Sequence, residues 1–332
     1  MTKKTYSNKG AQKKSSKSLV VLGIAVAVVI AGGVGAYLAT LGGGTGTSST
    51  SSAIGSWHDV HGVGMSGSGD DSSLYLATHT GLFKKDNNSG WTPTGSDRSD
   101  FMGFVISPAR DGTMYSSGHP VGGGNLGFRK STDSGLTWQS ISTVTTPPAD
   151  FHAIDASAVD ENLIYGAPGG GDNIYRTNDE GKTWTRLSPP DTVVSLAAHP
   201  VDAKVVYAGT VSGLYISEDQ GSTWQKAGSD TMQGVVTGLG FSDEKTLYAF
   251  LILEEGDGYI VKSIDEGNTF EKTEGQIAGA KAAWKFAIGG SDEVYTIVNQ
   301  NAPTGTAASV YRSGDGGLSW ILEGTNNKAV SE

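Results

Sequence analysis

The sequence predicts an all-β fold, a six-bladed β-propeller of four-stranded antiparallel blades. Two signals of the same period predict it. An aliphatic residue followed by Tyr recurs six times, with tyrosines 40–50 residues apart, and an eight-residue turn pattern follows each pair. The composition is rich in Gly (49 of 332 residues) and low in charged residues (17%), which is typical of all-β proteins with many turns.

The first 52 residues are expected to be a membrane-targeting segment followed by a flexible linker. Residues 1–18 are a basic, cytoplasmic tail, and residues 19–41 carry no charge. As a helix, residues 19–41 would span about 34 Å, enough to cross a bilayer. Lysines before this segment predict a single-pass anchor in the cell membrane with an extracytoplasmic body. A cleaved signal peptide, which would make the protein secreted, is the alternative. Residues 42–52 are a flexible Gly/Ser/Thr linker, and the propeller is expected over 53–332.

Charge and cysteine content exclude several classes of partner and site. The first 50 residues hold six lysines and no acidic residue, so removing them from the net charge of −10 leaves −16 on the remainder. Such an acidic body disfavours nucleic acid as a partner. The chain has no Cys, which excludes disulfides, thiolate nucleophiles and Cys-based metal sites.

The eight-residue pattern, S/T-x-D-x-G-x-T/S-W, is expected to form a turn at the outer rim of each blade. Asp accepts hydrogen bonds from nearby backbone N–H groups, Gly takes a conformation that other residues resist, and the aromatic ring packs between sheets. Five copies are complete, and a sixth, residues 84–91, is degenerate. We therefore predict structural roles for Asp133, Asp179, Asp219, Asp265 and Asp315, and for Trp138, Trp184, Trp224, Phe270 and Trp320.

Each repeat has room for four short strands. An apolar run (strand A) precedes each aliphatic–Tyr pair (strand B), and strands C and D flank the turn. Four strands at a period of 40–50 residues are typical of a propeller blade, and six units fit residues 57–325. How the ring closes stays open, since residues 53–57 could supply an outer strand to the last blade.

The turn pattern resembles the Asp-box, or BNR repeat, superfamily. That resemblance implies a propeller, and it suggests a glycosidase because sialidases and other glycoside hydrolases carry Asp-boxes. A typical sialidase is not expected: the family's arginine triad has too few counterparts here, and no FRIP-like motif occurs. Overall the motifs look most like exported bacterial and archaeal Asp-box proteins labelled glycosylhydrolase-like. The resemblance extends to photosystem II assembly factors and sortilin ectodomains, which bind proteins or peptides, so function must be argued from the site.

The histidines point to a site on one face of the ring. Aligning the A strands places His61, Met102 and His152 at equivalent positions, and aligning the B strands does the same for His79 and His119. Strand A begins and strand B ends on the face opposite the repeated turns, so these side chains should converge on one channel mouth. His58 lies just before His61, and Asp59, Asp100 and Asp150 each lie two residues before the aligned A-strand position. His199 is expected to be a turn residue at the far end of its strand.

Three functions are compatible with this cluster. Imidazoles with a nearby thioether and carboxylates indicate a transition-metal site, with copper or zinc as the ion. A glycoside hydrolase would use two of the aspartates. A protein-interaction scaffold would use the long loops of the same face and no metal. The partners expected are therefore the membrane, a metal, and a protein or glycan ligand.

Overall fold

The computed structural model describes residues 59–67, 72–85, 90–242, 245–253, 258–289, 292–302, 305–325 and 328–329. No helix within these ranges is long and apolar enough to cross a membrane. The predicted tail, anchor and linker, His58, and residues 53–57 all lie outside the described ranges.

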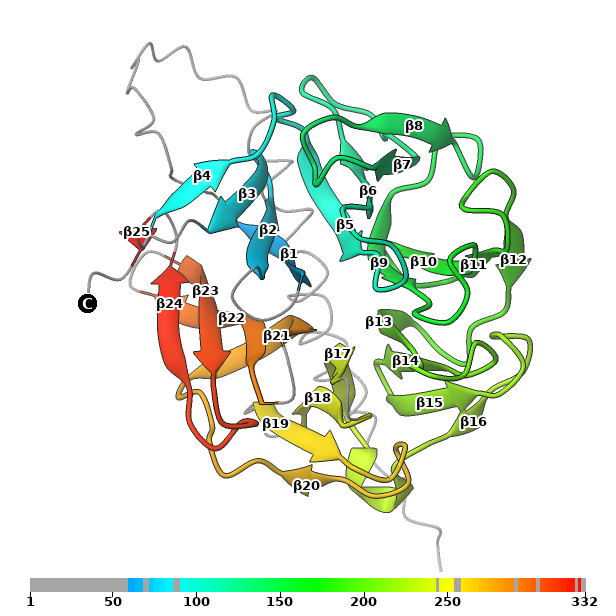
Figure 1. The fold of residues 1–332 in the computed structure, drawn as a ribbon. Coiled ribbons are helices and arrows are strands. Elements are labelled where there is room, and N and C mark those ends of the chain that lie inside the picture. Colours follow the sequence, from blue (N-terminus) through cyan, green and yellow to red (C-terminus); the bar gives the residue numbers. More distant parts are fainter. Residues whose placement is uncertain are drawn as a thin grey trace, which may run out of the picture. The chain divides into compact units, whose positions relative to one another are not determined.

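The described residues form a ring of six antiparallel sheets, which we number as blades 1 to 6 (Figure 1). Five blades have four strands, and the sixth has a short fifth strand at its edge. The strands are β1 Val60–Ser66, β2 Ser73–Thr78, β3 Gly81–Lys85 and β4 Trp91–Pro93 in blade 1; β5 Asp100–Ile106, β6 Met114–His119, β7 Phe128–Ser131 and β8 Gln139–Ser142 in blade 2; β9 Phe151–Ala156, β10 Ile164–Pro168, β11 Ile174–Thr177 and β12 Thr185–Leu187 in blade 3; β13 Val193–Ala198, β14 Val206–Thr210, β15 Gly213–Ser217 and β16 Gln225–Lys226 in blade 4; β17 Val235–Phe241, β18 Leu247–Ile252, β19 Gly258–Ser263 and β20 Glu271–Lys272 in blade 5; β21 Ala280–Ile288, β22 Val294–Ala302, β23 Gly305–Ser313, β24 Ile321–Thr325 and β25 Lys328–Ala329 in blade 6. A 3₁₀ turn, Ser229–Met232, precedes blade 5.

This architecture confirms the predicted six-bladed propeller. The first strand of each blade lines the centre and the fourth lies at the rim (Figure 1). In blade 6 the apolar run that precedes the aliphatic–Tyr pair, residues 284–290, predicts a start at Trp284, but β21 starts at Ala280 and carries two bulges. A bulge inserts residues that break the period-two pattern on which the prediction depended.

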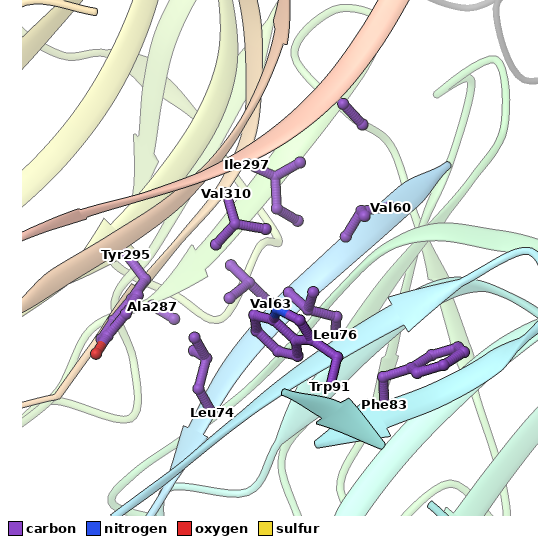
Figure 2. Packing of buried hydrophobic residues seen from close by; sticks show 11 residues of the cluster. Val60, Val63, Leu74, Leu76, Phe83, Trp91, Ala287, Tyr295, Ile297 and Val310 are labelled. Carbon is purple, nitrogen blue, oxygen red and sulfur yellow. The ribbon is translucent and has the colours of Figure 1, made fainter. Parts of the chain in front are cut away.

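The ring closes by apolar packing between blades 1 and 6. Val63 and Leu76 of blade 1 belong to one buried cluster with Ile297 and Val310 of blade 6, and Figure 2 shows these side chains facing one another. Lys85 of β3 also forms an ion pair with Glu323 of β24. Among the described residues, all five strands of the blade 6 sheet come from residues 280–329.

The repeated turn has the predicted structural role in every complete copy. In the copy at 131–138, Asp133 accepts hydrogen bonds from the backbone N–H (2.9 Å) and hydroxyl (2.6 Å) of Thr137, while Ser131 Oγ accepts from the N–H of Gly135 (2.9 Å). Gly135 has a φ of +83°, and Ser134 before it also has a positive φ of 56°. Two successive left-handed residues fold the chain back tightly, which explains the Gly of the pattern.

The aromatic residue that closes the turn joins neighbouring blades. The Trp184 ring of blade 3 lies 5.0 Å from the Phe128 ring of blade 2 and 5.3 Å from the Phe151 ring of its own blade. Its indole Nε1 donates to Ser142 Oγ of blade 2 (3.0 Å). The turn thus stabilises the interface between blades, and it lies between β11 and β12 as predicted.

Candidate metal centre at the channel mouth

Three structural positions, each repeated in every blade, surround the mouth. We call the first the bulge position. It is the residue of strand A left unpaired by a register shift near the start of the strand, and it is occupied in order by His61, Met102, His152, Val194, Thr237 and Lys281. Bulges of this kind redirect a side chain, and they commonly lie beside functional sites. The predicted equivalence of His61, Met102 and His152 is therefore confirmed.

The other two positions flank the bulge. The edge position is the fourth residue after the strand B tyrosine, and in blades 1 to 3 it holds His79, His119 and Gly169. The approach position lies two residues before the bulge, and in these blades it holds Asp59, Asp100 and Asp150. Within each blade the two are neighbours, because Asp100 pairs with His119 in the sheet and the N–H groups of His79 and Gly169 donate to the carbonyls of Asp59 (3.3 Å) and Asp150 (3.2 Å).

The first group of side chains joins blades 1 and 2. His61, His79 and Asp100 each offer a ligand atom within 4.8 Å of the others. His79 Nδ1 lies 3.1 Å from Asp100 Oδ2, and His61 Nε2 lies 3.8 Å from Asp100 Oδ1. The two imidazole rings are 4.5 Å apart between centroids. This is a compact set of two imidazoles and one carboxylate.

The first group is mostly buried, and its polar atoms lack partners. His61 Nε2, His79 Nε2 and Asp100 Oδ1 are buried without a hydrogen-bond partner among the described residues. Burial, reinforced by the neighbouring His79, holds the pKa of His61 well below its usual value, so this imidazole stays neutral with a lone pair available. Burial also raises the pKa of Asp100. Buried polar atoms without partners are uncommon in folded proteins, so this group calls for a functional explanation.

The second group joins blades 2 and 3. His119 Nε2 lies 3.3 Å and His152 Nε2 2.9 Å from the same oxygen, Asp150 Oδ2. The hydrogen bond to Asp150 raises the pKa of His119 to about 9. Burial raises the pKa of Asp150, but hydrogen bonds from both imidazoles outweigh it and leave that pKa below its usual range. The predicted cluster is thus two groups side by side.

Two residues of the prediction stand apart from these groups. Met102 occupies the bulge of blade 2 but is buried and is not part of the compact set of ligand atoms found among the described residues. Asp59 lies behind His79, with its Oδ2 3.8 Å from His79 Nε2, which is too far for a hydrogen bond.

Sequence reasoning missed a lysine that closes the channel. Lys285 of β21 donates to the backbone carbonyl of Ile154 (3.1 Å) and to Asp155 Oδ1 (3.0 Å) of β9, although blades 3 and 6 lie on opposite sides of the ring (Figure 1). Asp155 is three residues beyond His152, which is about 10 Å further along the strand. An ion pair therefore spans the channel at a level deeper than the mouth. The signal was a lysine inside an apolar run, and the second bulge of β21, which the sequence did not predict, turns it toward the channel.

A groove with a volume of about 560 Å³ lies elsewhere, between blades 4 and 5. Its wall includes His199, Tyr207, Lys245 and Glu266. His199 follows β13, as expected of a turn residue, but it is buried, with its ring 5.3 Å from that of Phe241. The repeated turn of blade 5 forms part of the wall of this groove. None of the residues described at the mouth lines it.

Comparisons with known proteins agree with this fold. Residues 156–286 match the family model of the DUF6242 beta propeller domain. Parts of the chain are also similar in sequence to xyloglucanases and to a photosystem II assembly factor. A xyloglucanase of Hypocrea jecorina is 30% identical over 49% of this chain and 20% of its own length. The photosystem II stability/assembly factor HCF136 of Cyanidioschyzon merolae is 28% identical over 39% of this chain and 28% of its own length.

Solved structures show the same architecture. The crystal structure of the Niastella koreensis GH74 enzyme superposes with a TM-score of 0.60 at 20% identity, covering 82% of this chain and 46% of that one. The GH74 xyloglucanase from Xanthomonas campestris gives a TM-score of 0.55 at 16% identity, with the same coverage of 82% and 46%. The chain therefore spans less than half the length of these relatives, and the likeness establishes the fold alone.

Proposed function

We propose that this protein is a membrane-tethered, extracytoplasmic propeller that binds a divalent transition-metal ion at its channel mouth through His61, His79 and Asp100. The observation that carries the proposal is the convergence of these three donors, from two blades, within 4.8 Å of one another. Donors bound to an ion at about 2.0–2.2 Å lie about 3.0–3.5 Å apart, so small movements of the 3.1 and 3.8 Å pairs complete the set.

The chemistry of the three donors suits such an ion. Two imidazoles and one carboxylate leave coordination positions open for water or an external ligand, as in catalytic zinc and non-haem iron sites. Asp59 stands on the far side of His79, where a movement that shortens the 3.8 Å separation to His79 Nε2 would let it orient this imidazole, as carboxylates do in many metal centres. The acidic body, with its charge of −16, attracts cations toward the mouth.

Elemental analysis of the full-length chain, purified without an affinity tag and loaded with Zn²⁺, tests this proposal. The unmodified chain should retain zinc after dialysis, and His61→Ala should lose one equivalent. His199→Ala is the matched control, because this histidine is buried but lies at the other end of its strand. Absence of zinc from the unmodified chain after loading would refute the metal site.

A glycoside hydrolase is the second candidate, and one observation favours it. The pKa of Asp100 is raised while that of Asp150 is lowered, and such opposed carboxylates are the usual acid and base pair. Since relatives are named xyloglucanases, xyloglucan is the first substrate to test. Release of reducing ends, abolished by Asp100→Asn but not by Asp111→Asn on the opposite face, would support this candidate. No hydrolysis and no metal would favour the protein-binding scaffold instead.

A further inference from the structure

We propose that the groove between blades 4 and 5 binds a neutral, polyhydroxylated ligand of the saccharide class, with His199 as a hydrogen-bond donor and Glu266 as an acceptor. The groove includes the repeated turn of blade 5, so it lies on the face away from the mouth, and the proposal is independent of the metal site. Its volume of about 560 Å³ falls within the range of about 300–1,000 Å³ that is usual for small-molecule sites. Two departures from the repeat meet at this groove.

The interface between blades 2 and 3 shows how the repeat closes the equivalent space. There the carboxylate of Glu180, the residue after the Asp of the repeated turn of blade 3, pairs with two cations of blade 2. One is Arg110, five residues before the strand B tyrosine, and the other is Lys130, which lies opposite that tyrosine in the sheet (3.1 Å to Glu180). These ion pairs leave the Glu180 side chain only 16% exposed.

The first departure is the loss of both cations at the interface between blades 4 and 5. The position of Arg110 is held in blade 4 by Asp202, and Ile216 takes the position opposite the strand B tyrosine. Glu266, the equivalent of Glu180, pairs instead with Lys245 of its own blade at 3.5 Å, and its side chain is 56% exposed. The groove therefore stays open, with a carboxylate in its wall that can accept from a ligand.

The second departure adds a hydrogen-bond donor to the same groove. The residue directly after strand A is Ser107 in blade 2, Ser157 in blade 3 and Ser242 in blade 5, but it is His199 in blade 4. The Oγ atoms of Ser157 and Ser242 accept hydrogen bonds from backbone N–H groups of the turn that follows (3.1 Å). The histidine keeps this role, because its Nδ1 accepts from the N–H of Val201 (3.4 Å). Its second nitrogen is a polar atom that serine lacks.

That second nitrogen is a buried donor without an acceptor. Burial lowers the pKa of His199, so the ring is neutral at pH 7. Since Nδ1 accepts, Nε2 carries the hydrogen. The side chain is 4% exposed, and Nε2 has no hydrogen-bond partner among the described residues. Glu266 Oε1 lies 4.0 Å away, which is beyond hydrogen-bond distance, so a donor and an acceptor face each other across a gap.

A hydroxyl group is the chemistry that fits this gap. One hydroxyl oxygen accepts from Nε2 and donates to the carboxylate, and with bonds of about 2.7–3.0 Å it can join two atoms that lie 4.0 Å apart. A carboxylate ligand has no hydrogen to donate, an ammonium cannot accept, and an amide accepts and donates through two different atoms. Because Nε2 is buried, the contact needs a rotation of the Glu266 side chain, which is exposed enough to move.

The rest of the wall calls for more than one hydroxyl. Asp202 and Glu218 add acceptors, while Lys226 and Lys245 add donors. A single water molecule satisfies only the pair of His199 and Glu266, whereas a ligand with several hydroxyls reaches both kinds of group along the groove. Such a ligand also carries no charge to be repelled by either the carboxylates or the ammonium groups. These are the properties of a neutral saccharide.

The test is isothermal titration calorimetry of the full-length chain with three neutral probes, cellotetraose, maltotetraose and mannotetraose. At least one should bind to the unmodified chain. His199→Ser installs the residue that the repeat uses at this position, so the turn keeps an acceptor and only the donor is lost. This variant should bind about tenfold more weakly, as expected for one hydrogen bond to a buried group. Asp111→Asn, in the corresponding turn of blade 2, is the control and should bind like the unmodified chain.

A second variant closes the groove without touching the histidine. Asp202→Arg/Ile216→Lys copies the two cations of blade 2 and should abolish binding by pairing with Glu266. Circular dichroism checks the fold of each variant, so a folding defect in one leaves the other as the test. No binding of the three probes to the unmodified chain, or unchanged binding in either folded variant, would overturn the proposal. Binding of tetraglycine in place of the saccharides, lost in both variants, would overturn it in favour of a peptide site.

Discussion

Removing the charge of Asp97 should destabilise the propeller far more than removing a surface charge. Asp97 lies in the segment between blades 1 and 2, and its Oδ2 accepts a 2.6 Å hydrogen bond from Arg129 Nη1 on β7. The Arg129 side chain is only 6% exposed and stacks on the rings of Phe101 (4.7 Å) and Trp138 (5.3 Å). Asp97→Asn leaves this guanidinium buried without its counter-charge.

The size of the effect follows from burial. Breaking a buried pair by removing one partner is worth about 3–5 kcal/mol, and a hydrogen bond to a charged group about 1.5–3 kcal/mol. The Asp97 side chain is 23% exposed, so water reaches part of the vacated site. We therefore expect a loss of about 2–3 kcal/mol in the free energy of unfolding. Burial lowers the pKa of Arg129 despite the pairing, and this shows that desolvation of the arginine is the main unfavourable contribution.

The double variant Asp97→Asn/Arg129→Met tests that reasoning. Met has no charge to desolvate and keeps contact with the two rings, so the double variant should lie within about 1 kcal/mol of the unmodified chain. Urea unfolding followed by tryptophan fluorescence measures both variants, and Glu271→Gln, in an exposed ion pair, should change stability by less than about 0.5 kcal/mol. An Asp97→Asn loss below 1 kcal/mol, or a double variant no more stable than the single one, would refute the argument.

Three further predictions use the same unfolding assay. Tyr207→Phe should cost about 1 kcal/mol, because its buried hydroxyl donates to a backbone carbonyl, whereas Tyr165→Phe should be neutral or stabilising, because that hydroxyl has no partner among the described residues; equal losses would contradict this. Turn hydrogen bonds lower the pKa of Asp179 to about 2, below its value in the unfolded chain. The stabilisation of the fold by this carboxylate is therefore full above about pH 4 and is lost as the pH falls toward 2. Asp179→Asn should destabilise the chain at pH 7, and the stabilities of the variant and the unmodified chain should converge near pH 2. Asp155→Ala should cost about 3–5 kcal/mol, because it leaves the ammonium of Lys285 across the channel without its carboxylate, while Lys285→Met should cost less, because Asp155 keeps a hydrogen bond from a backbone N–H; the reverse order would show that the ion pair does not close the channel.

Much of the mouth could be predicted from the repeat. The spacing from each Tyr to the next places His79 and His119 at one structural position, and the A-strand alignment does the same for His61 and His152. Strand B always ends where strand A begins, so those positions must share a face. What the alignment could not show is that they separate into two groups. That separation depends on whether an imidazole meets Asp100 or Asp150, and on Gly169, whose missing side chain leaves room for His152.

The structure of the repeated turn could be predicted from the sequence alone, because its Asp and Gly interact with residues of the same eight-residue segment. The segment recurs about every 40–50 residues, so the number of repeats could be predicted as well. Six repeats then dictate six blades, and their strand order dictates which ends meet at the mouth. Contacts between residues far apart in the chain were decided by the tertiary structure alone. Lys285 meets Asp155 across 130 residues because a ring brings opposite blades to one axis, and no local pattern records that distance. The same closure packs the last blade against the first and turns an open row of repeats into one core.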